Sequence, residues 1–229
     1  MNSPGLPYHK SQRSEGFSLL ELLIAMTLIL VIMGMTATLL VNAFNTRSRE
    51  NQRSDALADA QRALNIMTRE IANTGFGLTN NGIVAADSGL STIRVRANLN
   101  AFDSQSTSLS VNDRNEDVKY SLYTAGDASY IVRLDIGTEN QTTVLANRVD
   151  SLRFRYYPAK ISYTMATADC DISTASAEVT DKSQTKYIVM SICVQLPQVG
   201  TPRSPGYKPQ SRVQLVSDVT LRNADLGSY

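Results

Sequence analysis

Histidine is nearly absent from this chain of 229 residues, and its single copy is His9. From residue 10 onward there is therefore no Ser-His-Asp triad, no Cys-His pair and no histidine-based zinc site. The formal net charge is only +1, which gives no electrostatic indication of nucleic-acid binding. We expect neither an enzyme nor a bound metal or other cofactor.

Cysteine is also scarce, because the chain contains only Cys170 and Cys193. A metal site would need more ligands, and no Cys-x-x-Cys spacing is present. If this part of the chain lies outside the cytoplasm, a disulfide is the expected state. Closing that loop would stabilise the fold by about 3 kcal/mol. Two unrelated buried thiols are the alternative.

The chain does contain a long apolar run near its N-terminus. Leu22 to Val41 comprises twenty residues without a charged side chain. At about 1.5 Å per residue this run is roughly 30 Å long, enough to cross the hydrocarbon core of a bilayer. Glu21 stands directly before it. A carboxylate at membrane depth costs about 3 kcal/mol on insertion scales, so Glu21 is a candidate functional residue.

Directly before this run lies a motif that consists of Gly16, Phe17, Ser18-Leu19-Leu20 and Glu21. This pattern resembles the bacterial type IV prepilins and the related pseudopilins of type II secretion. The resemblance implies that a membrane-embedded prepilin peptidase cuts between Gly16 and Phe17 and methylates Phe17, giving N-methylphenylalanine. Residues 1–16 would then be a leader, and the mature chain would lack histidine. In a usual secretory signal the apolar region precedes the cut, whereas here it follows the cut and is kept.

The same resemblance gives Glu21 a role in assembly, since the acid of this family is thought to pair with the terminal amine of a neighbouring subunit. Glu21 lies one helical turn from the Phe17 amine and near the positive end of the helix dipole. In a low dielectric such a pair is favoured over two isolated charges. The alternative is an acid that is tolerated because it reaches the membrane interface.

Charges on the two sides of the run do not settle its orientation. Lys10 and Arg13 precede it, and Arg47, Arg49 and Arg53 follow it. The prepilin resemblance implies a cytoplasmic leader and a periplasmic head. We expect a single-pass protein of the inner membrane that later reaches the pilus or cell surface.

Helical periodicity continues beyond the apolar run. An apolar stripe recurs at spacings of three and four residues, formed by Leu57, Ala60, Leu64, Met67 and Ile71. No proline lies between Phe17 and Asn73, and Asn73-Thr74-Gly75 is a stop signal. We predict one helix of about 55 residues, near 80 Å long. Residues 17–44 would be its transmembrane part and 45–74 its amphipathic part.

Two features of this helix leave room for alternatives. A coiled coil could use the apolar stripe, although packing against a sheet of the same chain is the favoured interpretation. Many type IV pilins carry a helix-bending proline in the membrane segment, which this chain lacks; Gly34 and Thr36-Ala37-Thr38 are its soft points.

Alternation of apolar and polar residues predicts a β-rich head over residues 75–229, after a loop at 75–91. The expected inward positions are Ile93, Val95 and Ala97; Val118, Tyr120 and Leu122; Tyr130, Val132, Leu134 and Ile136; Leu152, Phe154 and Tyr156; Ile188, Met190, Ile192, Val194 and Leu196; and Val213, Leu215, Val219 and Leu221. A helix followed by strands predicts the α+β class, with the long N-terminal helix packed on an antiparallel β-sheet as in pilins.

Two loops of the head carry further expectations. Cys193 points away from the face of Ile192 and Val194, so a bond to Cys170 would pin residues 158–185 onto the outer side of the sheet. Residues 197–209 contain several prolines and are predicted to form an exposed flap.

Two polar clusters are weak candidates for binding sites. Arg203, Lys208 and Arg212 flank the flap and could touch nucleic acid, but a solvated rim is the favoured interpretation. Asp113, Asn115 and Asp117 imitate the start of a calcium loop but lack its glycine and its final glutamate, so a solvated turn is expected there.

The spacing along the sequence from the helix end at 69–75 to the strand at 151–156 is similar to that in PilW-type minor pilins and J-type pseudopilins. The resemblance implies a minor type IV pilin, a structural subunit that primes or caps pilus assembly for adhesion, motility or DNA uptake. Its implied partners are the prepilin peptidase, other minor and major pilins, the inner membrane and the assembly platform; no nucleic-acid or small-molecule ligand is expected. Alternatives are a type II secretion pseudopilin and a single-span periplasmic binding or sensor domain that never polymerises.

Overall fold

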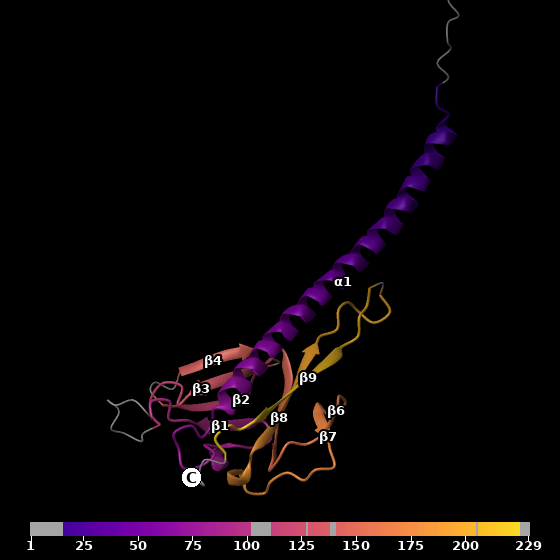
Figure 1. The fold of residues 1–229 in the computed structure, drawn as a ribbon. Coiled ribbons are helices and arrows are strands. Elements are labelled where there is room, and N and C mark those ends of the chain that lie inside the picture. The colour runs from indigo at the N-terminus through magenta and orange to yellow at the C-terminus, as the bar shows by residue number, and fades with distance from the viewer. Residues whose placement is uncertain (1–15, 102–110, 127, 138–140, 205, 225–229) are drawn as a thin grey trace, which may run out of the picture.

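A computed structural model gives the architecture and describes residues 16–101, 111–126, 128–137, 141–204 and 206–224. Residues 1–15 of the expected leader lie outside this part of the chain. Within the described residues a long helix precedes a β-rich head (Figure 1). The elements are α1 (Leu19–Ala72), η1 (Ala85–Asp87), β1 (Thr92–Arg96), β2 (Asp117–Ala125), β3 (Ala128–Asp135), β4 (Gln141–Ala146), β5 (Val149–Tyr157), β6 (Thr164–Ala166), β7 (Asp171–Ser173), η2 (Lys182–Gln184), β8 (Tyr187–Leu196) and β9 (Ser211–Thr220).

Helix α1 is one continuous element of 54 residues, about 80 Å long. The backbone N–H of Asn73 donates to the Glu70 carbonyl and that of Thr74 to the Ile71 carbonyl, each at 3.1 Å, which closes the C-terminus of the helix. Gly75 follows with a φ of 83°, a left-handed conformation that glycine adopts without strain. The predicted single helix and its stop signal are confirmed. Figure 1 shows that α1 curves gently and that its N-terminal half extends beyond the head.

The C-terminal third of α1 supplies the helical side of the hydrophobic core. Its buried residues are Ala56, Ala60, Ala63, Leu64, Met67, Ile71 and Ala72. They pack against β4, β8 and β9 of the same chain. Four of the five predicted stripe residues are therefore buried, while Leu57 lies at the edge of the contact. The predicted packing of the stripe against strands of the same chain, rather than in a coiled coil, is therefore confirmed.

The strands form more than the one sheet that we predicted. Strands β1 to β4 make an antiparallel meander in that order, and a second antiparallel sheet has the order β5-β8-β9. The split occurs at Arg148, which has a φ of 56° and accepts a hydrogen bond from the Gln195 N–H at 3.1 Å. This turn pairs the next strand with β8 rather than with β4. The α+β class with antiparallel strands is confirmed, and the single sheet was wrong.

Strand β3 presents the opposite face to the one that we predicted. Ile131 is fully buried, whereas Tyr130, Val132 and Leu134 are only half-buried. The buried face also includes Asp135, whose Oδ2 accepts the Asn115 N–H at 2.8 Å. Apolar residues occur on both faces of this strand, so alternation alone did not identify the buried one.

The segment between β5 and β8 covers the outer face of the second sheet. Strands β6 and β7 pair as a ribbon, and Cys170 beside this ribbon is bonded to Cys193 of β8, with Cα atoms 5.8 Å apart. A small apolar cluster separate from the main core lies beneath this segment; it contains Tyr157, Tyr187 and Val189, packed by Ile161, Tyr163, Ile172 and Val216. The predicted disulfide and the predicted pinning of residues 158–185 are confirmed.

Candidate assembly site

Residues 16–18, which directly precede α1, are exposed. Ser18 has β-region angles, and its Oγ accepts a hydrogen bond from the Leu20 N–H at 3.3 Å, which caps the helix. Phe17 is 83% exposed. A Cβ atom placed on Gly16 would have no heavy atom of another segment within 4 Å. The Gly16–Phe17 peptide bond therefore lies in accessible chain, two residues before the start of α1.

Glu21 occupies the first turn of α1, where the free N–H groups of the helix favour a negative charge. Its side chain is exposed and makes no hydrogen bond or ion pair with any residue that the structure describes. An acid at the mouth of an apolar segment is thus available to a group outside this chain.

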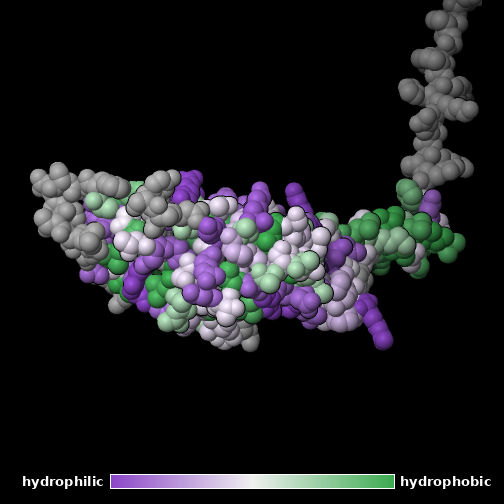
Figure 2. Space-filling view, turned by 60° about the horizontal axis from the view of Figure 1, so that its bottom comes forward, coloured by the Kyte–Doolittle hydropathy of each residue, from purple (hydrophilic) through white to green (hydrophobic). Residues whose placement is uncertain are grey.

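Residues 22–41 of α1, which we call the apolar rod, are exposed throughout. Figure 2 shows the hydrophobic surface of α1 projecting from a head of mixed polarity. By length and composition this part of the helix is able to cross a membrane. In a soluble monomer every side of the apolar rod would be in contact with water, which is unfavourable for apolar side chains. The rod therefore requires lipid or other apolar helices around it.

The polar side chains of the apolar rod are compatible with lipid. Thr27 donates its hydroxyl hydrogen to the Ile24 carbonyl at 2.8 Å, Thr36 to the Ile32 carbonyl at 3.0 Å, and Thr38 to the Met35 carbonyl at 2.8 Å. Each hydroxyl is therefore satisfied within the helix, as a segment without access to water requires.

Residues 11–37 match the prokaryotic N-terminal methylation motif. The match covers the accessible Gly16–Phe17 bond, Glu21 and most of the apolar rod. It supports the type IV pilin and pseudopilin family and indicates a structural subunit rather than an enzyme. Such a motif implies processing by a prepilin peptidase and assembly with other pilins, and the helix fits a membrane-anchored pilin. No curated protein and no solved structure matches the chain significantly.

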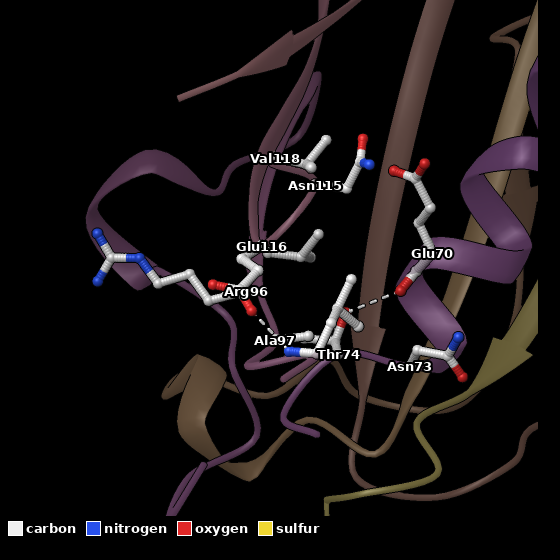
Figure 3. A pocket seen from close by; sticks show the side chains of 10 residues that line it. Glu70, Asn73, Thr74, Arg96, Ala97, Asn115, Glu116 and Val118 are labelled. Carbon is white, nitrogen blue, oxygen red and sulfur yellow. Dashed lines mark hydrogen bonds between the residues drawn. The ribbon is translucent and has the colours of Figure 1, made fainter. Parts of the chain in front are cut away.

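The opposite end of α1 borders a cavity of about 260 Å³ in the head (Figure 3). Glu70 and Glu116 approach it from opposite walls. The Glu116 carboxylate accepts the backbone N–H groups of Leu99 at 2.8 Å and Asp113 at 3.1 Å. Glu70 accepts a hydrogen bond from the Tyr120 hydroxyl and one from Arg133 Nε at 3.0 Å. Both acids are thus engaged in holding the fold.

The contacts of Glu70 join α1 to the first sheet. The Arg133 side chain is only 11% exposed, and it also donates from Nη2 to Asn115 Oδ1 at 2.8 Å. Burial, together with the Glu70 carboxylate, raises the pKa of Tyr120, so its phenol stays protonated. Sequence reasoning missed this network because Glu70 and Arg133 are 63 positions apart and no local pattern links them.

A second network that we did not predict stabilises the edge of β1. Asp117 accepts hydrogen bonds from Arg94 Nε at 2.7 Å, Arg94 Nη2 at 2.8 Å and Arg96 Nε at 2.8 Å. Arg94 also pairs with Asp87 at 2.6 Å. Burial alone would raise the pKa of Asp117, but the two guanidinium groups outweigh it and hold that pKa below its ordinary value.

The segment that imitates a calcium loop does not gather its side chains around one point. Asp113 accepts from Asn100 Nδ2 at 2.6 Å, Asn115 accepts from Arg133, and Asp117 is held by Arg94 and Arg96. Among the described residues no group of three or more His, Cys, Asp or Glu side chains is arranged to hold a metal ion.

The flap at 197–209 is less exposed than we predicted. Most of its first half is exposed, but Val199, Ser204 and residues 206–208 are half-buried. The reason is that the flap lies against α1, where Arg49 Nη2 donates to the Pro209 carbonyl at 2.6 Å and to Ser211 Oγ at 2.9 Å. Of the three basic residues noted beside it, Arg212 pairs with Asp150 at 2.8 Å.

Proposed function

We propose that this chain is a minor type IV pilin, a structural subunit that primes or caps pilus assembly. The observation that carries the proposal is the methylation motif placed directly before a fully exposed apolar rod. A rod of this kind is stable in the bilayer and, after extraction from it, among the helices of like subunits. The pilus would then serve adhesion, motility or DNA uptake.

In this proposal the prepilin peptidase cleaves between Gly16 and Phe17 and methylates the Phe17 amine. The new ammonium group of one subunit then pairs with Glu21 of another inside the filament. Glu21 has no partner among the described residues of its own chain, which leaves it available for that contact. The pair forms in a low dielectric, where opposite charges attract strongly and misaligned helices are penalised.

The proposed topology has the leader in the cytoplasm, one inner-membrane span and the head in the periplasm. The bond between Cys170 and Cys193 supports this orientation, because disulfides persist in oxidising compartments. The proposed partners are the prepilin peptidase, the pilus assembly platform, and other minor and major pilins. A large head of two sheets and a ribbon favours a minor subunit of PilW type over a shaft subunit.

A type II secretion pseudopilin of J type is the second candidate. It shares the methylation motif and the apolar rod, and the same two-sheet head is compatible with it. Deletion of the gene, followed by separate assays of surface pili and of protein secretion, discriminates between the two candidates. Loss of neither, together with capture of a soluble ligand and no pilin partner, would favour an anchored binding or sensor domain.

The assembly role is tested by Glu21→Gln, which removes the charge and keeps the shape. Glu50→Gln is the matched control, because Glu50 lies on the same helix beyond the apolar rod with its side chain 61% exposed. Breaking a buried ion pair costs about 3 to 5 kcal/mol, so we expect Glu21→Gln to be processed normally but to fall about tenfold or more in sheared filaments. Immunoblots of the filament and membrane fractions measure this. Equal incorporation of the two variants would contradict the pairing.

A further inference from the structure

The flap between β8 and β9 reaches the part of α1 that directly follows the apolar rod. Val199 and Lys208 exchange two backbone hydrogen bonds, at 3.0 and 2.9 Å, which prolong the hairpin beyond its strands. At the tip, a Cβ on Gly206 would come within 3.4 Å of Asn42 Cα, so the backbone there rests directly on α1. Asn42 follows Val41, the last residue of the rod. Figure 1 shows this flap rising beside α1.

The surface formed by flap and helix is strongly basic. Residues 42–49 and 197–212 contain no acidic residue and five basic ones, Arg47, Arg49, Arg203, Lys208 and Arg212, which we call the basic collar. Residues 17–229 as a whole are balanced, because removal of Lys10, Arg13 and Glu15 from the totals of 22 and 21 leaves 20 of each sign. Five positive charges therefore gather next to the apolar rod, and a net excess of five negative charges remains in the rest.

Most of this charge is not neutralised within the chain. Arg47, Arg203 and Lys208 have no side-chain ion pair or hydrogen bond with the residues that the structure describes. Arg49 binds only the neutral oxygens of Pro209 and Ser211, so its charge persists. Arg212 alone has an acidic partner, Asp150, among the described residues.

We propose that the basic collar binds the phosphate groups of anionic phospholipids at the membrane surface from which α1 emerges. This rests on the proposed membrane residence of the apolar rod, which brings the collar to headgroup level. Guanidinium groups match phosphate geometry, and basic residues within a Debye length of an anionic surface are attracted to it. The half-buried Tyr207 at the tip is of a residue type enriched at that interface.

A lipid surface fits the collar better than nucleic acid or a neighbouring subunit. Arg47 and Arg49 follow the rod on α1, and the flap that carries Arg203 and Lys208 contacts α1 at Asn42 and Arg49. A bilayer surface at the end of the rod therefore faces both elements together. With the flap and α1 both bound to headgroups, the head is held at a fixed height and tilt before it joins a filament. Transfer into the filament then requires release of these contacts.

The chain contains no tryptophan, so Tyr207→Trp introduces a single fluorescent reporter at the flap tip. The full-length chain is reconstituted in phosphatidylcholine vesicles with or without phosphatidylglycerol, each carrying a headgroup nitroxide quencher. We expect quenching of this flap-tip reporter to be several-fold stronger with phosphatidylglycerol and to fall as salt is added. Leu99→Trp, at a position 50% exposed beside the last turn of α1, is the distant control and should stay unquenched.

Charge reversal identifies the residues responsible. Arg203→Glu with Lys208→Glu should abolish the phosphatidylglycerol-dependent quenching of the flap-tip reporter. Lys160→Glu with Arg114→Glu changes the total charge equally at exposed positions elsewhere in the head and should leave it intact. Equal quenching in both lipids, an unaffected double reversal, or quenching relieved by DNA or by another pilin at constant salt would overturn the proposal. Failure of the chain to float with vesicles would instead refute membrane residence itself.

Discussion

Two acids of this chain occupy opposite surroundings, since Glu21 is exposed and Asp117 is buried. Glu21 is exposed at the mouth of the apolar rod and has no partner in the described part of its own chain. Asp117 is buried and accepts three hydrogen bonds from Arg94 and Arg96. The first is available for contact between subunits, whereas the second holds the fold.

The pairing of Asp117 predicts acid sensitivity of the head. Because its pKa is lowered in the folded state, its contribution to stability is present above the unfolded pKa of about 4 and is lost as pH falls further. We expect Asp117→Asn to lower the free energy of unfolding by about 2 kcal/mol at pH 7 and to differ less from the parent in acid.

Chemical denaturation of the detergent-solubilised chain at several pH values measures this difference. Asp55→Asn, at an exposed helical position, is the control and should change stability little at any pH. A cost for Asp117→Asn that stays constant down to strongly acidic pH would contradict the assigned role of the arginine pair.

A motif can be recognised from sequence where its residues lie close together along the chain. Gly16, Phe17 and Glu21 lie within six positions, so their spacing alone identifies the motif. The Glu70, Tyr120 and Arg133 network joins α1, β2 and β3, and only the tertiary fold brings these residues together.

At the scale of elements, prediction succeeded where one face of an element is apolar. Strands β1, β2 and β5 alternate cleanly, and their expected core residues Ile93, Tyr120 and Phe154 are fully buried. Strand β4, with the sequence QTTVLA, is exposed over its first four residues and carries no such signal. Edge strands of this kind are defined by backbone pairing to a neighbour, which the local sequence does not encode.

The disulfide between Cys170 and Cys193 attaches the β6–β7 ribbon to β8. Replacement of Cys170 and Cys193 by alanine should lower the free energy of unfolding by about 3 kcal/mol, since the unfolded chain regains the freedom of the open loop. We also expect earlier proteolysis within residues 158–185.

Denaturant titration and limited proteolysis measure both effects. The oxidised parent is the reference, and the reduced parent is the internal control, which should behave like the variant. A variant as stable as the oxidised parent, or one that is destabilised further by reductant, would refute this role for the bond.

At the scale of the whole molecule, the chain consists of an exposed apolar rod and a self-contained head. The head buries its own core against the last third of α1, so it does not need the rod for packing. The rod therefore serves an environment outside the chain. Its threonine hydroxyls are satisfied internally, and Glu21 marks its entrance. These properties agree with the proposal that the rod exchanges lipid for the helices of neighbouring subunits.

In the proposed function, removal of the leader converts the chain into an assembly subunit. Intact-mass spectrometry of the protein isolated from its native membrane tests this most directly. We expect a polypeptide that begins at Phe17 and carries one extra methyl group, while a Gly16→Ala variant, with a side chain at the cleavage position, retains residues 1–16. A native chain that still carries Met1, or a Gly16→Ala chain processed like the parent, would contradict the account.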